Sequence, residues 1–306
     1  MSDTIEIVCP MLENRDEDRF KLLVKSLNKF VKDKNYKLHL ISKSGKSPVI
    51  SKNILSYKES DIDPLFDKKH DLYKNIPEFK NNYGWWKQQL LKLASHKICS
   101  SECILFVDCD CFLTKPLEKK NLYKNKKIRI NLCFNGSFDN WYNGSRNILR
   151  IPEFPIPSEK IGVMPICLSS KILQSLEKYL RLIYKNSFSQ FLLLNTNAYR
   201  GVATGRKDPV SKSLSTIFDP RDFSSTWTET TLYHIFAEYT GMMSEYHTID
   251  NSYQPHGNCF WNPNETDTWK PEASFKKGHK FYFTVAQSVA HKTPQWVEEK
   301  VKEYLS

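Results

Sequence analysis

The 306-residue sequence contains no long apolar run, no CxxC pair and no low-complexity segment. No window reaches the roughly 18 apolar residues that a membrane-spanning helix needs, so we expect no transmembrane segment. The missing CxxC pair argues against a zinc ribbon and a thioredoxin-type site. Hydrophobic residues make up 40% and charged residues 26% of the chain, which excludes a disordered chain, a coiled coil and a collagen-like repeat. Without repeats or a clear linker, one domain over residues 1–306 is expected.

The first residues also lack the features of a signal peptide. Residues 1–4 are polar, and they carry neither a basic region nor an apolar stretch. Several of the eight cysteines lie inside apolar runs, where a free cysteine serves as a small hydrophobic side chain. We therefore expect a reducing, cytoplasmic compartment.

The charge balance is basic. Lys and Arg number 45 against 34 Asp and Glu, a net charge of +11, which favours anionic partners. The excess lysines are scattered, however, as on a solvated surface. Clustered arginines and a known reading motif are missing, so a nucleic-acid partner is not expected, although a basic nucleic-acid-binding protein is the non-enzyme alternative. Peripheral contact with an anionic membrane surface is compatible with this charge and is kept as an alternative.

Apolar periodicity predicts alternating strands and helices. An apolar strand at residues 5–8, a helix over 20–30 and a strand over 37–42 form a βαβ unit, which indicates a parallel sheet with covered faces. A third strand is expected to start at 48–50. Later patterns predict a helix over 85–98, strands over 104–107 and 128–133, helices over 169–184 and 228–239, a strand over 280–285 and a helix from 294 onwards. The segments 138–157 and 195–216 are interpreted as a folded loop that lines a site and as a lid or binding loop.

Two carboxylates follow the most apolar strand. Asp108 and Asp110 stand two residues apart after residues 104–107, so both can reach one point at the carboxyl edge of the sheet. Open α/β sheets bind ligands at that edge. Paired carboxylates suit a hard divalent cation, which in turn suits phosphate oxygens. The alternative is that the two acids only end the strand or cap the next turn.

A helix motif before this strand extends the pattern. Residues 84–92 read Gly-Trp-x-x-Gln-Gln-x-x-Lys, and the acidic motif follows at Asp108 and Asp110. Together they resemble a largely uncharacterised group of bacterial and viral GT-A-fold glycosyltransferases. The resemblance is specific over residues 83–117 and looser over 161–165 and 227–233.

The resemblance implies a GT-A-like (Rossmann-like) α/β fold, with a mixed, mostly parallel sheet flanked by helices in a single domain. Residues 1–117 would form the half that binds the nucleotide sugar, and residues 118–306 the half that binds the acceptor. It implies a UDP- or GDP-sugar donor, a glycan or lipid-linked acceptor, and Mn²⁺ or Mg²⁺ as cofactor.

The resemblance also implies roles for particular residues. Asp108 would bind the donor ribose or the metal, and Asp110 would bind the metal. On the helix, the residues facing the donor would be Trp85, Gln88, Gln89 and Lys92. A late histidine often completes such metal sites, and His291 fits best by position, with His256 in a plausible binding turn as the second candidate.

Glu229 is the candidate general base, because an inverting transferase needs a carboxylate to take the proton of the acceptor hydroxyl. An equally strong interpretation places Glu229 at the third position of a helix capping box that begins at Thr226. Asp222 is the nearest substitute for the base. A retaining enzyme would need no such base, so the inverting mechanism is only slightly favoured.

Two other enzyme classes share parts of this pattern. A haloacid-dehalogenase-type phosphatase also has an apolar strand followed by DxD, but its motif usually has Thr or Val where Phe112 stands here, and it usually lies near the N-terminus. A nucleotidyltransferase shares metal-bound diphosphate chemistry, but the first strand is not followed by a glycine-rich phosphate loop. Both remain alternatives to the glycosyltransferase interpretation.

Overall fold

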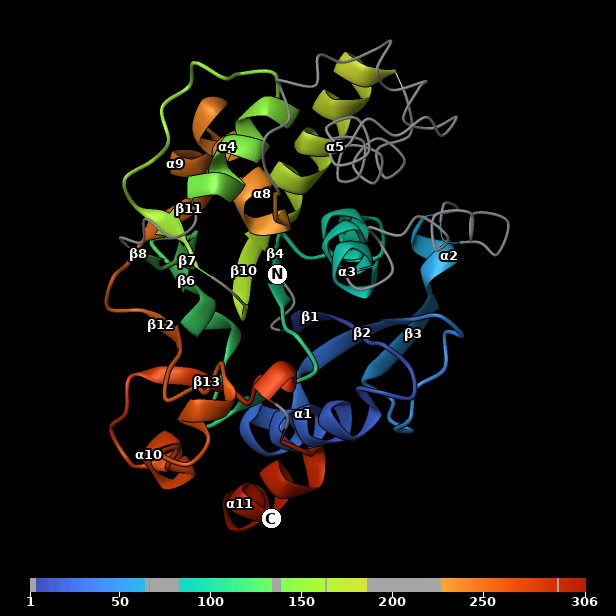
Figure 1. Ribbon diagram of the computed structural model, residues 1–306, viewed down its shortest axis with the longest axis vertical. Coiled ribbons are helices and arrows are strands. Elements are labelled where there is room, and N and C mark those ends of the chain that lie inside the picture. The colour runs from blue at the N-terminus through green and yellow to red at the C-terminus, as the bar shows by residue number, and fades with distance from the viewer. Residues whose placement is uncertain are drawn as a thin grey trace.

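The computed structural model describes residues 4–63, 66, 83–133, 139–162, 164–185, 227–290 and 292–306. Its centre is a five-stranded sheet in the order β10-β4-β1-β2-β3 (Figure 1). These strands are β1 (Ile5–Pro10), β2 (Tyr36–Ser42), β3 (Ile54–Lys58), β4 (Cys103–Phe106) and β10 (Ile166–Ser169). The first four run parallel, and β10 runs antiparallel along β4. The sequence prediction of a mixed, mostly parallel sheet flanked by helices is confirmed.

Strands β10, β4 and β1 are buried on both faces, as expected where helices cover a parallel sheet, whereas the edge strand β3 is partly exposed. Side chains alternate between the faces, so Ile104 and Phe106 enter one hydrophobic cluster while Leu105 and Val107 enter the other. Four helices supply side chains to the first cluster: α3 (Tyr83–Ala94), α4 (Asp139–Ile148), α5 (Ser170–Tyr184) and α8 (Glu229–Tyr239). The second cluster lies on the other face of the sheet, where it packs under α1 (Glu17–Phe30). Helix α11 (Pro294–Leu305) contacts α1 on that same side (Figure 1).

Smaller sheets extend the structure beyond the carboxyl edge. β5 (Cys111–Leu113) pairs antiparallel with β13 (Phe281–Val285), which pairs parallel with β12 (Gln254–His256). The C-terminal part of the chain is thereby joined to the turn that carries the two carboxylates. The remaining short elements are α2 (Glu59–Ile62), β6 (Tyr123–Lys124), β7 (Lys127–Ile130), β8 (Leu132–Cys133), β9 (Lys160–Ile161), α9 (Met242–Tyr246), β11 (His247–Ile249) and α10 (Pro271–Phe275).

Three details differ from the sequence prediction. The third strand begins at Ile54 and not at 48–50, because the register of β3 against β2 starts at that residue. The strand predicted over 128–133 is two strands, since β7 pairs with β6 and β11 while β8 pairs with β9. The segment 138–157, predicted as a loop, contains helix α4, whose buried residues Tyr142, Ser145 and Ile148 recur at intervals of three.

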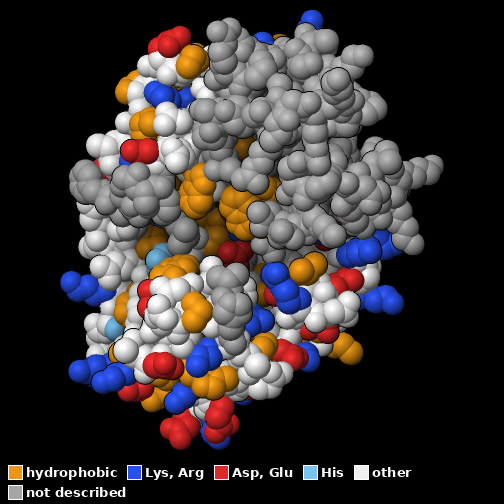
Figure 2. Space-filling view, viewed as in Figure 1, with side chains coloured by type: hydrophobic (Ala, Val, Ile, Leu, Met, Phe, Trp, Pro, Cys, Tyr) orange, Lys and Arg blue, Asp and Glu red, His pale blue; other side chains and the backbone are white. Residues whose placement is uncertain are grey.

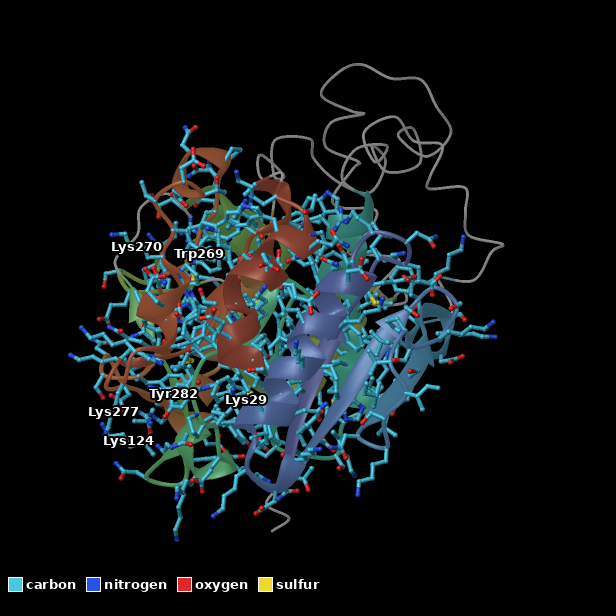
Figure 3. The ribbon with its side chains drawn as sticks, turned by 90° about the horizontal axis from the view of Figure 1, so that it is seen from below. Lys29, Lys124, Trp269, Lys270, Lys277 and Tyr282 are labelled. Atoms are coloured by element: carbon cyan, nitrogen blue, oxygen red, sulfur yellow. The ribbon has the colours of Figure 1, made fainter. Side chains whose placement is uncertain are left out.

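The basic residues are spread over many elements. Lys29, Lys124, Lys270 and Lys277 are exposed and lie on separate segments (Figure 3). Such a distribution fits a solvated surface. Within the described ranges, none of the helices combines the length and the apolar character needed to cross a bilayer.

Candidate functional site

A pocket of about 230 Å³ lies at the carboxyl edge of the central sheet. Elements far apart in the chain supply its wall: α3, the turn after β4, α4, the start of α8 and the segment around β13. The polar and aromatic side chains that line it are Trp85, Gln89, Lys92, Asp108, Trp141, Thr228, Glu229, Thr230, Thr231, Trp261 and Gln287. Figure 2 shows hydrophobic and acidic side chains together in the hollowed centre of this face.

Lys92 connects the two acidic residues of the pocket. Its Nζ lies 2.8 Å from Asp108 Oδ1 and 3.0 Å from Glu229 Oε1, and its side chain is 2% exposed. Burial alone would lower the pKa of Lys92, but the two carboxylates outweigh burial and raise that pKa. Lys92 is therefore a permanent cation that holds Asp108 and Glu229 on either side of it.

Glu229 is the first residue of α8, and its carboxylate points to Lys92. The N-cap of α8 is Thr228, whose hydroxyl accepts from the Thr231 backbone N–H at 3.1 Å. The capping-box interpretation of Glu229 is therefore wrong, because Thr231 is the third residue of the helix. The Thr231 hydroxyl oxygen accepts a hydrogen bond from the Thr228 backbone N–H. The backbone N–H of Glu229 donates to Gln89 Oε1 at 3.1 Å, which links α8 to α3.

Helix α3 presents one face to the pocket. Trp85, Gln89 and Lys92 recur at helical spacing and all line it. Gln88, predicted to face the donor, does not line this pocket and instead lines a separate small cleft with Arg15 and other residues. Trp85 is 39% exposed at the rim, and its ring centroid lies 6.5 Å from that of Trp141. The pocket thus has an aromatic wall next to its charged floor.

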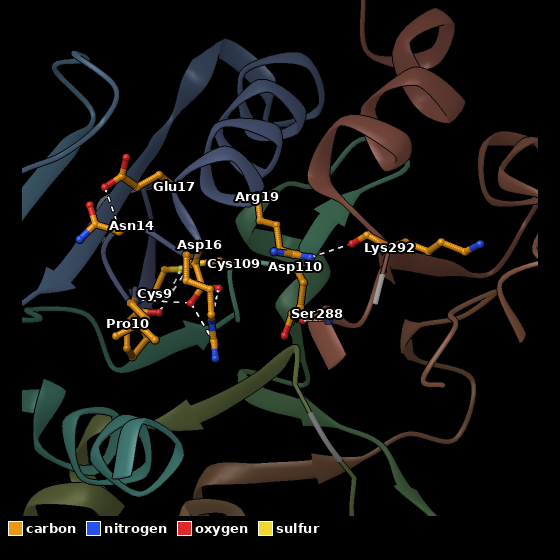
Figure 4. Close-up of polar contacts among 12 residues, drawn as sticks. Cys9, Pro10, Asn14, Asp16, Glu17, Arg19, Cys109, Asp110, Ser288 and Lys292 are labelled. Atoms are coloured by element: carbon orange, nitrogen blue, oxygen red, sulfur yellow. Dashed lines mark hydrogen bonds and ion pairs between the residues drawn. The ribbon is translucent and has the colours of Figure 1, made fainter. Parts of the chain in front are cut away.

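Asp110 is more deeply buried than Asp108. Its Oδ2 accepts from the Ser288 backbone N–H at 2.9 Å, so the segment after β13 covers it (Figure 4). Burial and the neighbouring Asp108 raise the pKa of Asp110 to about 7. The intervening Cys109 turns the other way, where its Sγ lies 3.5 Å from Cys9 Sγ. Asp108 lines the pocket, whereas Asp110 is not among the residues that line it.

The two carboxylates fit a hard divalent cation. Asp108 Oδ1 contacts Lys92 but has no hydrogen bond of regular geometry. Burial first and the charge of Asp108 second raise the pKa of Asp110, and a bound cation would favour the ionised carboxylate against both. Oxygen donors of this type are the ligands that Mg²⁺ and Mn²⁺ prefer.

The other residues predicted for the site do not line the pocket or lie outside the described residues. His256 contacts Cys259 Sγ through Nδ1 at 3.7 Å and does not line the pocket. Over the described part of the chain, His256 forms no close cluster of ligand atoms with Asp108 and Asp110. His291, Asp222 and the predicted lid at 195–216 lie outside the described residues.

Several residues around the pocket carry no sequence signal of their own. Trp141 lies in the segment predicted to line a site, and no motif distinguishes it there. Trp261 and Gln287, which line the pocket, and Ser288, which binds Asp110, come from the C-terminal third, where no sequence motif points to the acidic turn. Their position follows from the pairing of β13 with β5, a contact between segments about 170 residues apart.

Comparison with known proteins identifies the family. The chain belongs to a family of unknown function (DUF6492), whose model matches residues 2–306. None of the curated proteins matches it. Among solved structures, the apo form of mouse xyloside xylosyltransferase 1 is similar over 92% of this chain and 97% of that chain, with 13% identity and a TM-score of 0.45. This similarity is too weak to carry a functional conclusion.

Proposed function

We propose that the protein is a metal-dependent glycosyltransferase that moves a sugar from a nucleoside-diphosphate donor to a hydroxyl acceptor. The observation that supports this most is the pocket at the carboxyl edge of the sheet, where Asp108, Lys92 and Glu229 meet beside tryptophan rings. Carboxylates can bind a cation and sugar hydroxyls, and aromatic rings suit the apolar faces of a sugar or base. The proposal joins this arrangement to the GT-A resemblance of residues 83–117.

Asp108 and Asp110 are proposed to hold Mn²⁺ or Mg²⁺ together with the donor diphosphate. The bound cation would supply Lewis-acid stabilisation of the leaving nucleoside diphosphate. Ser288 donates to one oxygen of Asp110, which fixes the orientation of that carboxylate. A UDP- or GDP-sugar is the proposed donor, and a glycan or lipid-linked hydroxyl compound is the proposed acceptor.

Glu229 is proposed as the general base of an inverting transfer. Its carboxylate lines the pocket and lies 3.0 Å from Lys92 Nζ, which fixes its orientation. The acceptor hydroxyl would give its proton to Glu229 as the oxygen attacks the sugar carbon. Gln89 and Lys92 would act as positioning residues, because they hold the start of α8 and the Glu229 carboxylate in place.

The experiment is a donor-hydrolysis screen over a panel of nucleotide sugars with Mn²⁺ or with chelator. The proposal predicts release of a nucleoside diphosphate from one donor, only with the cation. Release of inorganic phosphate from phosphomonoesters would instead favour the phosphatase alternative, and pyrophosphate production would favour a nucleotidyltransferase. Gln88→Ala is the matched control, because Gln88 lies on α3 but outside the pocket.

A further inference from the structure

A second cluster of potential metal ligands lies away from the pocket. Glu6 on β1, His39 on β2 and Cys99 before β4 bring one ligand atom each within 4.8 Å of one another. Glu6 and His39 are buried, and Cys99 is half-buried. Over the ranges that the structure describes, no other group of three His, Cys, Asp or Glu side chains comes so close.

The Glu6 carboxylate is held in a fixed orientation. Its Oε2 accepts from the backbone N–H groups of Ser100 at 2.7 Å and Ser101 at 2.8 Å. Its Oε1 accepts from the Ser100 hydroxyl at 2.8 Å. Burial would raise the pKa of Glu6, but these hydrogen bonds and His39 lower it overall, so the carboxylate is ionised at neutral pH. Oε1 faces His39.

The His39 imidazole has one partnered and one unpartnered nitrogen. Nδ1 lies 3.3 Å from the Tyr57 hydroxyl, and the two rings stack with centroids 5.7 Å apart. Nε2 is buried, has no hydrogen-bond partner and lies 3.9 Å from Glu6 Oε1. This separation is too long for a hydrogen bond. The ligand atoms of a tetrahedral zinc ion with bonds of about 2 Å lie about 3.4 Å apart, so the two atoms need to approach each other by about 0.5 Å to hold the ion.

The histidine is also in the correct protonation state to bind a metal. Burial lowers the pKa of His39 more than Glu6 raises it, so the imidazole is neutral at pH 7. Tyr57 orients the ring through Nδ1, as outer-shell partners do for metal-binding histidines. A neutral, oriented nitrogen that is buried without a partner is otherwise costly.

Cys99 supplies a third donor of a softer kind. Its thiol is not part of a disulfide, and burial together with Glu6 raises its pKa in the metal-free protein. A divalent cation reverses this preference, because it binds the thiolate and releases the proton. The partial exposure of Cys99 gives an ion a path from solvent.

We propose that Glu6, His39 and Cys99 form a Zn²⁺ site with water as the fourth ligand. One imidazole nitrogen, one thiolate and one carboxylate are a donor set that zinc accepts, and the thiolate disfavours Mg²⁺ and Mn²⁺. The ion would join β1, β2 and the segment that enters β4, and so stabilise the sheet beneath the pocket. This inference is independent of the proposed glycosyltransferase activity.

The test uses Co²⁺ alone as a spectroscopic probe for zinc. Full-length protein freed of metal by chelation is titrated with Co²⁺, and a thiolate-to-cobalt charge-transfer band is recorded. We expect the band to saturate at one Co²⁺ per chain and to vanish when Zn²⁺ is added. Absence of a thiolate band in the wild-type protein would overturn the proposal.

Variants assign the band to this cluster. Cys99→Ser should abolish the band. Tyr57→Phe, which removes the hydroxyl that orients His39, should weaken Co²⁺ affinity by roughly 10–100-fold. His39→Gln removes a ligand and should weaken Co²⁺ affinity by more than that. Cys259→Ser is the matched control, because Cys259 is also half-buried and contacts a histidine. Asp110→Ala should also keep the band. A band that persists in Cys99→Ser, or is lost in Cys259→Ser, contradicts the assignment.

A second measurement covers the case in which Cys99→Ser does not fold. Circular dichroism and thermal melting in chelator show whether each variant is folded. In the wild-type protein, alkylation of Cys99 is followed by peptide mass spectrometry with and without Zn²⁺. Zn²⁺ should slow alkylation of Cys99 at least about tenfold and leave Cys259 unchanged. An equal rate at Cys99 with and without Zn²⁺ would refute the site.

Discussion

Replacing Lys92 with Met tests the charge arrangement of the pocket. The substitution removes the ammonium that lies 2.8 Å from Asp108 Oδ1 and 3.0 Å from Glu229 Oε1, while it keeps most of the side-chain volume. Breaking a buried ion pair by removing one partner costs about 3–5 kcal/mol, because a charge stays buried without compensation. The Asp108 side chain is 37% exposed and can be hydrated, so most of this cost comes from Glu229, which is 5% exposed.

The stabilisation supplied by Lys92 is fully present at neutral pH. In the wild-type protein the folded-state pKa of Lys92 is raised, so its ion-pair stabilisation is complete below the unfolded value of about 10.4 and is constant between pH 5 and 8. A measurement at pH 8 therefore reports the whole stability that the Lys92 charge supplies.

Urea unfolding at pH 8, followed by circular dichroism, measures the difference. We expect Lys92→Met to lose about 3–5 kcal/mol of unfolding free energy. Gln88→Met on the same helix, outside the pocket, should stay within about 0.5 kcal/mol of the wild-type protein. A loss below about 1 kcal/mol in Lys92→Met would refute the buried Asp108–Lys92–Glu229 arrangement.

Three further predictions address other residues. Glu229→Gln should keep donor binding and lose about 10²–10⁴-fold in transfer rate, measured by product formation; near-normal transfer would remove Glu229 as the base. The pKa of Asp110 is raised to about 7, so the metal-free wild-type protein should lose stability as the pH rises from about 4 to 7. Asp110→Asn should remove this loss in urea titrations. An unchanged pH profile in that variant would contradict the prediction. Gly257→Ala should destabilise the folded protein by about 1–3 kcal/mol, because a Cβ at this position would lie 2.4 Å from the Phe281 ring. In the control Gly84→Ala, the added Cβ meets no atom within 4 Å, so the melting temperature should not fall. Equal melting temperatures for the two variants would refute the clash.

The fold and the acidic turn were predictable from local sequence patterns. A wholly apolar run at 104–107 indicates a buried parallel strand, which the structure has as β4 at Cys103–Phe106, and Asp108 and Asp110 follow its carboxyl end. The βαβ unit at residues 5–42 indicates a parallel sheet, so the strand at 104–107 ends at the carboxyl edge of that sheet. These inferences use only neighbours in the chain, which is why they succeed.

The partners of the acidic turn were not predictable in this way. Lys92 and Glu229 are 137 positions apart, and no local pattern pairs them. Which of Gln88 and Gln89 faces the pocket depends on how α3 rotates to bury Leu90, and only tertiary packing settles that. The helix-cap interpretation of Glu229 was wrong because either of two threonines could begin the helix from the sequence, and the N-cap in the structure is Thr228.

The most direct test of the central claim is nucleoside-diphosphate release from a panel of UDP- and GDP-sugars by the wild-type protein, Asp110→Ala and the control Gln88→Ala. The account predicts Mn²⁺- or Mg²⁺-dependent release by the wild-type protein and by Gln88→Ala. It predicts that release stops in chelator and in Asp110→Ala, although that variant stays folded by circular dichroism. Full activity of Asp110→Ala in chelator, or no release from any donor by the wild-type protein, would contradict it.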